Sequence, residues 1–576
     1  MADTDKSVVR ILFNLLEAHG VRRVVCSPGS RNAPLLIAAD ARKRLETSVV
    51  IDERSAAFVA LGMAMVSRRP VALVCTSGTA LLNYAPAVAE AYYQGVPLIV
   101  ISADRPLEWI DQDDSQTIRQ PEALRNFVKG SYSLSDREQC DRPGWYETRI
   151  VNDAILTALA PKQGPVHINV RLSPPLGATV EDDDADDSPV RMIERIFPSD
   201  VPDAATMKRL AADARECKLL VVAGFMPPDA RLNKALAAMR RMPGVAVVAE
   251  SVSNLHLRPE DYAADTLFCS LDDDERLKLA PDLVISLGGA LVSRMLKEFL
   301  RECGHRNPDM RHWSVGHNHT TVDCFQALSC RIDADPGRFM SALAGRMTHF
   351  DRTAPDSSLH DCRYAALWHE ARIPAMRRMA RIAEECGWSD LKAFDIILDR
   401  IPADANLILS NGTSIRYAQI LKRHIPHAEY CNRGVSGIDG SISTAVGAAL
   451  CYQGGETWLG TGDTSWAYDI SALQSLKSLG AALKIILINN AGGGIFRFIS
   501  STAVLECRER CFCADPELDS RSLAATFGLA YRLADSAADL AEALQWLAAA
   551  PAPAVVEVTT PPEESAAILR RALRMT

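Results

Sequence analysis

The stretch "WLGTGDTSWAYDISALQSLKSLGAALKIILINNAGGGIF" (residues 458–496) decides the fold. It predicts an apolar strand, a tight turn at Asp463, a helix, a second apolar strand that ends at Asn490, and a glycine-rich loop. A strand–helix–strand unit of this kind is right-handed and brings both strand ends to one edge of a parallel sheet. We therefore expect Asp463 and Asn490 to lie close together at that edge.

The groups at this edge suit a hard metal ion. A carboxylate (Asp463), an amide oxygen (Asn490) and a backbone carbonyl (Gly492) can bind Mg²⁺, which completes its coordination shell with water and phosphate oxygens. Gly462 has no side chain, so the backbone there can approach a phosphate closely. The pattern predicts a magnesium and diphosphate site.

The rest of the chain repeats the alternation of strands and helices. Short, continuously apolar runs alternate with helical patterns, which is typical of parallel sheets covered on both faces. An acidic stretch at 180–189 and a polar stretch at 348–361 are interpreted as linkers. We predict an α/β protein with three doubly wound parallel-sheet domains in series, at 1–180, 190–350 and 385–576.

Composition excludes several classes of protein. The net charge of -9 argues against a general binder of nucleic acid or anionic membranes. No apolar run reaches the ~18 residues of a membrane span, and "MADTDKSVVR" (1–10) does not resemble a signal peptide, so we expect a cytoplasmic protein. The 15 cysteines are scattered. The cluster of Cys507, Cys511 and Cys513 lacks the second pair of ligands that a structural zinc site normally has, and its role is left open.

Gly-Asp followed at this spacing by Asn-Asn resembles the diphosphate-binding domain of the thiamin-diphosphate-dependent enzymes. The resemblance implies that thiamin diphosphate is the cofactor, with Mg²⁺ or Mn²⁺ bound by Asp463, Asn490 and Gly492. It also implies that the cofactor contacts Gly462, Ser436 and Ile438. Ile438 would hold the cofactor in its bent shape; the alternative for this residue is ordinary core packing.

Two carboxylates precede an apolar run in "IDERSAAFVALGMA" (51–64). Acidic residues at this position often only begin a helix, because they interact favourably with its positive end. The resemblance implies a catalytic role for Glu53, which would contact N1′ of the cofactor's aminopyrimidine and promote loss of the thiazolium C2 proton. Such a carboxylate needs a desolvated pocket that raises its proton affinity.

A closer resemblance extends over almost the whole chain. It rests on "SPGSRNAPL", "IDERSAAFVALG", "CTSGTA", "ISADRP", "CNRGVSGIDGSISTAVGAA" and "NNAGGGIF". These motifs are similar to those of the thiamin-diphosphate enzymes of menaquinone biosynthesis, which decarboxylate 2-oxoglutarate and add the succinyl carbanion equivalent to isochorismate in a 1,4 fashion. The alternatives are an acetolactate-synthase-like carboligase or 2-oxoacid decarboxylase, and a scaffold without activity.

Both of these substrates are dicarboxylates, and arginine is the side chain best shaped to pair with a carboxylate. Four arginines stand in loop motifs that follow strand-like runs, although each alone could form a structural salt bridge. The resemblance implies a substrate site made of Ser30, Arg31, Arg105, Gln116, Arg294, Arg416 and Arg433, walled by Ile495 and Phe496.

Two positions depart from the pattern of relatives, and both lie in the substrate site. Gly412 stands where many relatives have serine, and Ser293 stands where some have lysine. The segment after Phe498 is expected to form a lid. The resemblance also implies a homodimer or a dimer of dimers, in which Glu53 and Asp463 of one site come from different subunits.

Overall fold

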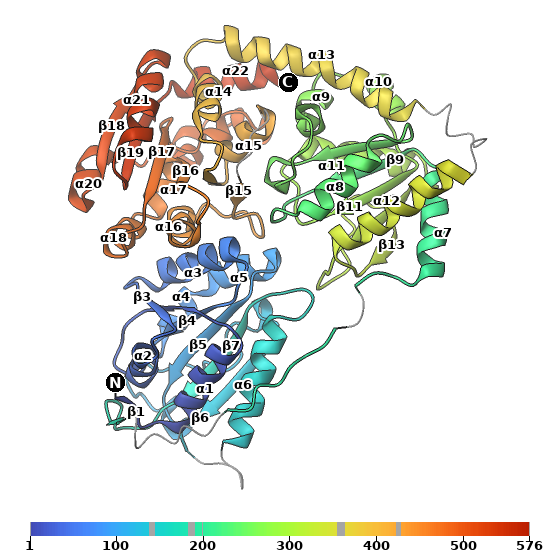
Figure 1. Ribbon diagram of the computed structural model, residues 1–576. Coiled ribbons are helices and arrows are strands. Elements are labelled where there is room, and N and C mark those ends of the chain that lie inside the picture. Colours follow the sequence, from blue (N-terminus) through green and yellow to red (C-terminus); the bar gives the residue numbers. More distant parts are fainter. Residues whose placement is uncertain are drawn as a thin grey trace.

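The computed structural model describes residues 2–137, 144–181, 190–197, 200–353, 363–421 and 428–574. Figure 1 shows three α/β domains, with the first below the second and third. Each domain is built on one sheet whose strands all run parallel, and helices cover the sheets. The predicted fold class is therefore confirmed.

The first domain contains a six-stranded sheet. Its strand order is β3 (Glu46–Val49), β2 (Arg23–Cys26), β4 (Val71–Cys75), β5 (Leu98–Asp104), β7 (Val166–Arg171) and β6 (Ser131–Ser135). The helices are α1 (Ser7–Ala18), α2 (Ala33–Ala41), α3 (Glu53–Ser67), α4 (Thr79–Asn83), α5 (Ala85–Gln94) and α6 (Trp145–Ala158). A short antiparallel pair joins β1 (Asp3–Thr4) to β8 (Thr179–Val180). The central strands β4 and β5 are buried along their whole length, which explains the continuously apolar sequence of β4 and of the first part of β5, 98–101.

The second domain has a five-stranded sheet. Its order is β10 (Val245–Ala249), β9 (Leu219–Ala223), β11 (Leu283–Leu287), β12 (Arg311–Val315) and β13 (Leu328–Ile332). The main helices are α7 (Ala204–Arg215), α8 (Ala230–Met239), α9 (Ala264–Phe268), α10 (Asp273–Lys278), α11 (Arg294–Arg306) and α12 (Pro336–Thr353). Helix α12 runs into the polar stretch that was predicted to be a linker, so the start of that linker was wrong.

Helix α13 (Tyr364–Glu385) follows, and it packs mainly on the second domain. Trp368 lies in the core that contains Phe268 and Phe299, and the buried Arg372 pairs with Asp261 at 3.2 Å. This helix continues through Pro374, a residue that normally breaks helices. Packing of its buried face therefore outweighs the local preference of the sequence.

The third domain contains the second six-stranded sheet. Its order is β15 (Ala428–Cys431), β14 (Asn406–Leu409), β16 (Thr457–Gly462), β17 (Leu483–Asn489), β19 (Ala554–Thr559) and β18 (Ala530–Ala534). The helices are α14 (Asp390–Arg400), α15 (Thr413–Ile420), α16 (Ser441–Cys451), α17 (Asp463–Tyr468), α18 (Ser471–Ser478), α19 (Ser500–Ala503), α20 (Ser520–Phe527), α21 (Ala537–Ala549) and α22 (Pro562–Ala572). The strands and helix expected in 458–496 are β16, α17 with α18, and β17.

Helix α3 of the first domain crosses α16 of the third, and Figure 1 shows the two helices one above the other. The helices touch through glycine: a Cβ atom at Gly62 would collide with the Thr444 carbonyl, and one at Gly447 with the Val59 carbonyl. At the start of α3, Ser55 Oγ lies 3.0 Å from both Ser443 Oγ and Ser471 Oγ. The first and third domains are therefore in close contact within one chain.

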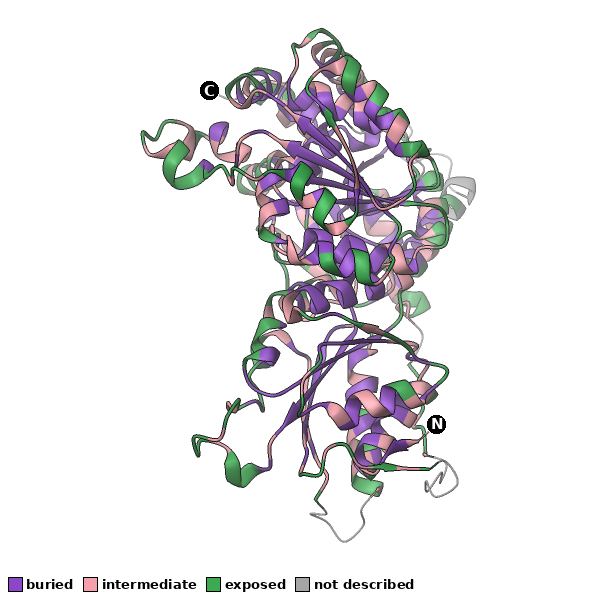
Figure 2. Ribbon diagram, turned by 90° about the vertical axis from the view of Figure 1, so that its left-hand side faces the viewer, coloured by how far each residue is buried: buried purple, intermediate pink, exposed green. Residues whose placement is uncertain are grey.

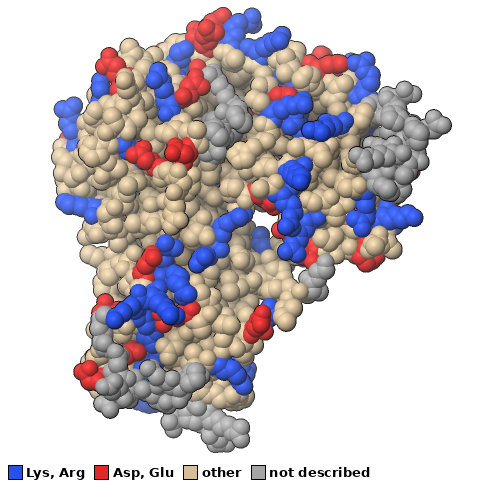
Figure 3. Space-filling view, in the orientation of Figure 1, with Lys and Arg blue, Asp and Glu red and all other residues tan. Residues whose placement is uncertain are grey.

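Burial follows the layered arrangement. Figure 2 shows the sheets buried and the outer helix surfaces exposed. Among the described residues, no helix is both long enough and apolar enough to cross a bilayer. Figure 3 shows Lys and Arg side chains around a hollow where the domains meet, so positive charge is concentrated locally in spite of the negative net charge.

Candidate active site

Asp463 lies at the carboxyl end of β16 and is buried. Its Oδ2 accepts hydrogen bonds from the backbone N–H of Gly492 at 2.7 Å and of Asn490 at 3.1 Å. Its Oδ1 accepts one from the Thr464 N–H at 2.6 Å. Burial raises the pKa of Asp463, although these hydrogen bonds act against the rise. Asp463 and Asn490 are thus neighbours, as their positions at two strand ends predicted.

The loop after β17 is fixed from several sides. Arg497 is buried and donates to the carbonyl oxygens of Asn490 at 3.0 Å and Ala491 at 2.7 Å. The Gly492 carbonyl receives only a long contact of 3.5 Å from Arg497. The Asn490 Nδ2 donates to Asp390 at 2.7 Å. Within the described ranges, no donor contacts the side-chain oxygen of Asn490, and Arg497 is the one donor near the Gly492 carbonyl, so both oxygens can accept another partner.

Two glycines at neighbouring strand ends leave open space. A Cβ atom built on Gly462 or on Gly412 would meet no atom within 4 Å. Gly462 precedes α17 at the end of β16, and Gly412 precedes α15 after the adjacent β14. The N-terminal N–H groups of a helix suit an anion such as a phosphate. This open edge fits a diphosphate, and the oxygen donors beside it fit a divalent metal.

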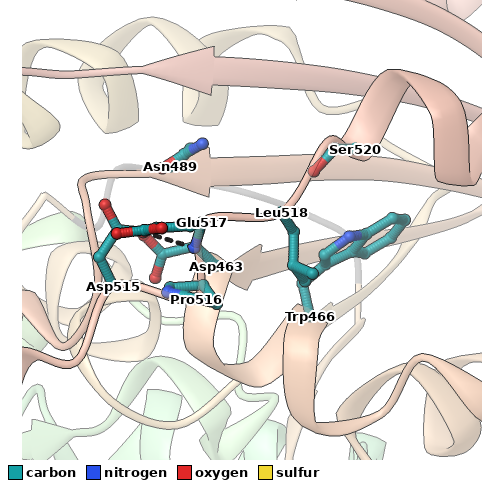
Figure 4. Close-up of a pocket in the computed structure, with 8 residues that line it drawn as sticks. All are labelled: Asp463, Trp466, Asn489, Asp515, Pro516, Glu517, Leu518 and Ser520. Carbon is teal, nitrogen blue, oxygen red and sulfur yellow. Dashed lines mark hydrogen bonds between the residues drawn. The ribbon is translucent and has the colours of Figure 1, made fainter.

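Asp463 also lines a cavity of about 130 Å³. Figure 4 shows the side chains of Asp463, Asp515 and Glu517 close together, while the Trp466 ring lies apart from them on the side of Leu518. No group of three His, Cys, Asp or Glu side chains in the described part of the chain could hold a metal ion. A metal at Asp463 would consequently depend on amide, carbonyl and external oxygens, and the cluster of Cys507, Cys511 and Cys513 forms no metal centre of this kind.

Glu53 is the first residue of α3 and is partly buried. Its neighbour Asp52 caps the helix by accepting from the backbone N–H of Arg54 at 2.9 Å and of Ser55 at 3.3 Å. Glu53 itself has no hydrogen bond or ion pair to the described residues. Its charge lies near Cys75, whose pKa is raised mainly by burial and further by Glu53. Of the two carboxylates, Asp52 serves the helix and Glu53 is available for other chemistry.

The loop between β15 and α16 carries Arg433, Ser436 and Ile438. The buried Glu90 of α5 accepts from the backbone N–H of Gly434 at 2.5 Å and of Val435 at 2.7 Å. Ser436 adopts a positive φ of 68°. The first domain therefore holds a loop of the third domain in place, and this role of Glu90 was not predicted.

Asn411 binds the same loop from its other side. Its Nδ2 donates to the carbonyl oxygens of Asn432 and Gly437, both at 2.6 Å. Its Oδ1 accepts from Arg433 at 3.0 Å. Asn411 thus sets both the path of the loop and the direction of the Arg433 side chain.

One group of expected substrate residues lies in the first domain. Arg31 is buried and donates to the Leu172 carbonyl at 2.9 Å. Arg105 pairs with Asp114 at 2.7 Å, and its charge helps burial to lower the pKa of Arg31. Ser30 is exposed, and the Gln116 carbonyl accepts from Ser77. The contacts of these residues all stay within the first domain.

A second group lies where the second and third domains meet. Burial lowers the pKa of Arg416, and the charges of Arg433 and Arg294 lower it further. Arg416 lies within α15 and not in a turn as expected, and it donates to the Gly412 carbonyl at 3.2 Å. Arg294 begins α11 with its side chain exposed and paired with Glu298 at 2.6 Å.

Lys297 belongs to this second group but was missed by the sequence reasoning. It donates to the Leu291 carbonyl at 3.4 Å, and Arg433 donates to the same carbonyl at 3.3 Å. Ser293 directly precedes α11, and its side chain is occupied, since it caps the helix and donates to Asp265 at 2.7 Å. A cation is therefore present beside Arg433 even though position 293 is serine.

Ile495 and Phe496 lie in the short 3-10 helix η5 (Gly494–Arg497), which follows the glycine-rich loop. Both are partly buried, and the Phe496 ring lies 5.6 Å from that of Phe512. The segment after Phe498 returns to the loop, where the Gly493 N–H donates to the Cys513 carbonyl at 2.6 Å. This segment covers the loop that carries Asn490, as a lid would.

Comparison with known proteins supports the cofactor inferred from this geometry. Residues 6–123 match the family described as "Thiamine pyrophosphate enzyme, N-terminal TPP binding domain", and residues 411–558 match "Thiamine pyrophosphate enzyme, C-terminal TPP binding domain". Thiamine pyrophosphate is another name for thiamin diphosphate. The chain thus has both domains that define the class of thiamin-diphosphate enzymes.

Similar proteins identify a particular family within the class of thiamin-diphosphate enzymes. A protein of Porphyromonas gingivalis is 40% identical over 98% of this chain and 96% of its own length. Proteins of Cytophaga hutchinsonii (39%, covering 92% of each chain) and Flavobacterium johnsoniae (34%, covering 98% of each) are also similar. All three are named 2-succinyl-5-enolpyruvyl-6-hydroxy-3-cyclohexene-1-carboxylate synthase. The chain belongs to this family of enzymes.

Proposed function

We propose that this enzyme decarboxylates 2-oxoglutarate and adds the succinyl carbanion equivalent to isochorismate, forming 2-succinyl-5-enolpyruvyl-6-hydroxy-3-cyclohexene-1-carboxylate for menaquinone biosynthesis. The names of its relatives support the product. The observation that carries the proposal is the set of arginines at the edges of the thiamin-diphosphate domains, because both substrates are dicarboxylates. We further propose that the enzyme is cytoplasmic and works as a homodimer or a dimer of dimers.

The cofactor end of the site is assigned to the third domain. Asp463, the Asn490 side-chain oxygen and the Gly492 carbonyl would hold Mg²⁺ or Mn²⁺, and the open space at Gly462 would admit the diphosphate. Ser436 and Ile438 lie on the loop held by Glu90, where they would contact the rest of the cofactor. When bound, thiamin diphosphate supplies the nucleophilic carbon and the electron sink that decarboxylation of a 2-oxoacid requires.

Glu53 is assigned the proton transfer. Its carboxylate has no partner among the described residues and begins a helix that is otherwise deeply buried. A carboxylate in that position can exchange a proton with a ring nitrogen of the bound cofactor. Asp52, by contrast, is committed to capping α3 and is expected to leave the chemistry unaffected.

The substrate end is assigned to the two groups of cations. Arg416, Arg433 and Lys297 form one group, in which the charge of Arg433 lowers the pKa of both Arg416 and Lys297, so a bound carboxylate would relieve their mutual repulsion. Arg31 and Arg105 form the other, with Ser30 and Gln116 beside them. We propose that the first-domain group of one subunit completes the site on its partner, because the hydrogen bonds and ion pairs of this group with the described residues of its own chain do not reach the third domain. Ile495 and Phe496 would wall the pocket.

The experiment is an assay of the purified enzyme with thiamin diphosphate, Mg²⁺, 2-oxoglutarate and isochorismate, with the product identified by mass spectrometry. Pyruvate replaces 2-oxoglutarate in a matched reaction. We expect the succinyl product with 2-oxoglutarate and little turnover with pyruvate. Turnover of pyruvate to acetolactate, with no product from isochorismate, would refute the proposal.

A further inference from the structure

The side chain of Asn490 has two chemically different ends. Its amide oxygen can bind a metal ion, whereas its amide nitrogen carries two hydrogens and cannot. A rotation of the amide by 180° would exchange the two ends at almost no steric cost. A metal site at this position therefore needs something that fixes which end faces the metal.

Asp390 provides such a constraint. Its Oδ2 accepts from the Asn490 Nδ2 at 2.7 Å, and its Oδ1 accepts from the Thr560 hydroxyl at 2.5 Å. Its backbone N–H donates to Ser565 Oγ at 3.0 Å. Asp390 is only 2% exposed, so water does not compete for these contacts. Two distant segments of the chain thus hold the carboxyl group, and a third holds the backbone of the same residue.

We propose that Asp390 is a positioning residue that turns the Asn490 amide so that its oxygen faces the metal of the cofactor. The inference rests on the proposed use of a divalent metal at Asp463. An Asp390 oxygen that carries no proton can only accept a hydrogen bond, and therefore only the nitrogen end of the Asn490 amide can face it. The orientation holds even for a neutral carboxyl group, provided that its proton lies on the oxygen facing Thr560.

The other polar groups around Asn490 are already engaged. Its backbone N–H donates to Asp463, and its carbonyl accepts from Arg497. Among the described residues, no donor contacts its side-chain oxygen. A Cβ atom on Gly494 would lie 2.7 Å from the Asn490 Nδ2, so glycine at that position leaves room for the amide. The amide oxygen is therefore the group in this constellation that is left to coordinate a metal.

The test measures binding of Mn²⁺ by electron paramagnetic resonance in the presence of thiamin diphosphate and without substrates. Asp390→Leu removes the acceptor, and we expect Mn²⁺ to bind roughly 10- to 100-fold more weakly, the usual cost of losing a partner of a metal ligand. Asp390→Asn can still present an oxygen to Asn490 while its nitrogen faces Thr560, so we expect a loss of only a few fold. Asp390→Ser carries the same expectation as Asp390→Leu should the leucine variant not fold.

A second variant separates the positioning role of Asp390 from a purely structural role, because the two roles affect Mn²⁺ affinity and melting temperature differently. Thr560→Val removes the other hydrogen bond of Asp390, and we expect a lower melting temperature with nearly unchanged Mn²⁺ affinity. Normal Mn²⁺ affinity in folded Asp390→Leu or Asp390→Ser protein would overturn the proposal. If the unmodified protein bound no Mn²⁺ with thiamin diphosphate, the proposed metal site at Asp463 would fail instead. The two failures are therefore distinguishable.

Discussion

The ammonium group of Lys297 and the guanidinium group of Arg433 share one acceptor, the Leu291 carbonyl. Lys297 comes from the second domain and Arg433 from the third, so the two domains bring like charges together. Burial lowers the pKa of Lys297, and the charge of Arg433 lowers it further. Two cations that donate to one carbonyl form a local concentration of positive charge, which suits the binding of a carboxylate.

Lys297→Met should therefore weaken the binding of a dicarboxylate substrate. We expect the apparent KM for 2-oxoglutarate or isochorismate to rise by about tenfold or more, since a hydrogen bond to a charged group contributes about 1.5–3 kcal/mol. Arg301→Met on the same helix is the control, because Arg301 binds the Cys324 carbonyl near the surface. Equal KM values for both variants would contradict the assignment of Lys297.

Arg31→Ala and Arg433→Ala are expected to act on substrate binding more than on folding. Loss of one charge-assisted contact should cost roughly 1.5–3 kcal/mol of substrate binding, visible as a higher KM. Each arginine also donates to a backbone carbonyl, so a small decrease in melting temperature is expected as well. A large decrease in melting temperature with unchanged KM would instead identify these arginines as structural salt-bridge residues.

Asp463→Ala should abolish metal-dependent binding of the cofactor, because it removes the one carboxylate assigned to the metal. Calorimetric titration with thiamin diphosphate and Mg²⁺ measures the effect. Glu517→Gln is the matched control, since Glu517 is a carboxylate that lines the same cavity. Near-normal affinity in the Asp463→Ala protein would remove the metal assignment.

The buried Asp469 should make the stability of the folded protein depend on pH. It is fully buried and accepts from Ser443, and burial raises its pKa from 3.8 to about 6. Because the folded state holds the proton more tightly, this stabilising contribution is complete below the unfolded pKa of 3.8 and is lost as the pH rises through about 6. A shift of this size corresponds to roughly 3 kcal/mol.

The comparison is between the unmodified protein and Asp469→Asn, which cannot titrate at this position. The difference in melting temperature between the two should favour the unmodified protein most at about pH 4, decline towards pH 6 and stay constant above about pH 7. The same difference at every pH would show that Asp469 does not titrate in this range.

The proposed shared site makes a prediction about mixtures. In a heterodimer of Glu53→Gln and Asp463→Ala chains, one site receives both changes and the other receives neither. Mixing the two inactive proteins under conditions of subunit exchange should restore up to half of the sites in each heterodimer. Verified exchange without recovered activity would show that each site is built within one chain, where α3 already touches the third domain.

Much of the fold could be predicted because the strands are buried. Continuous apolar runs such as 98–101 and 485–488 indicate parallel strands locally, and the short turns between elements leave few alternatives. Helix α13 could not be predicted in this way. The many polar residues in its sequence and Pro374 argue against a helix. The helix is stabilised by the packing of its buried side chains against the second domain.

Local sequence patterns predicted the candidate site only at residues that stand at the end of a strand. Asp463 and Asn490 were found because parallel strands bring their carboxyl ends to one edge. Asp390 and Glu90 were missed, because they lie 100 and 344 residues from Asn490 and Gly434, the residues that they bind. No local pattern encodes such a contact, since it depends on how whole domains pack.

The crossing of α3 and α16 also affects how the enzyme is made. Ser55 and Ser443, which meet there, are 388 residues apart. A ribosome adds about 5–20 residues per second, so the apolar face of α3 emerges roughly 20–80 seconds before the helix that covers it. During that interval β2, β4 and α5 of the first domain can already pack on one side of α3, and only the side that faces α16, which includes Val59, Gly62 and Met63, lacks its cover. The first domain is therefore made with an uncovered helix surface that only the last domain of the chain can bury.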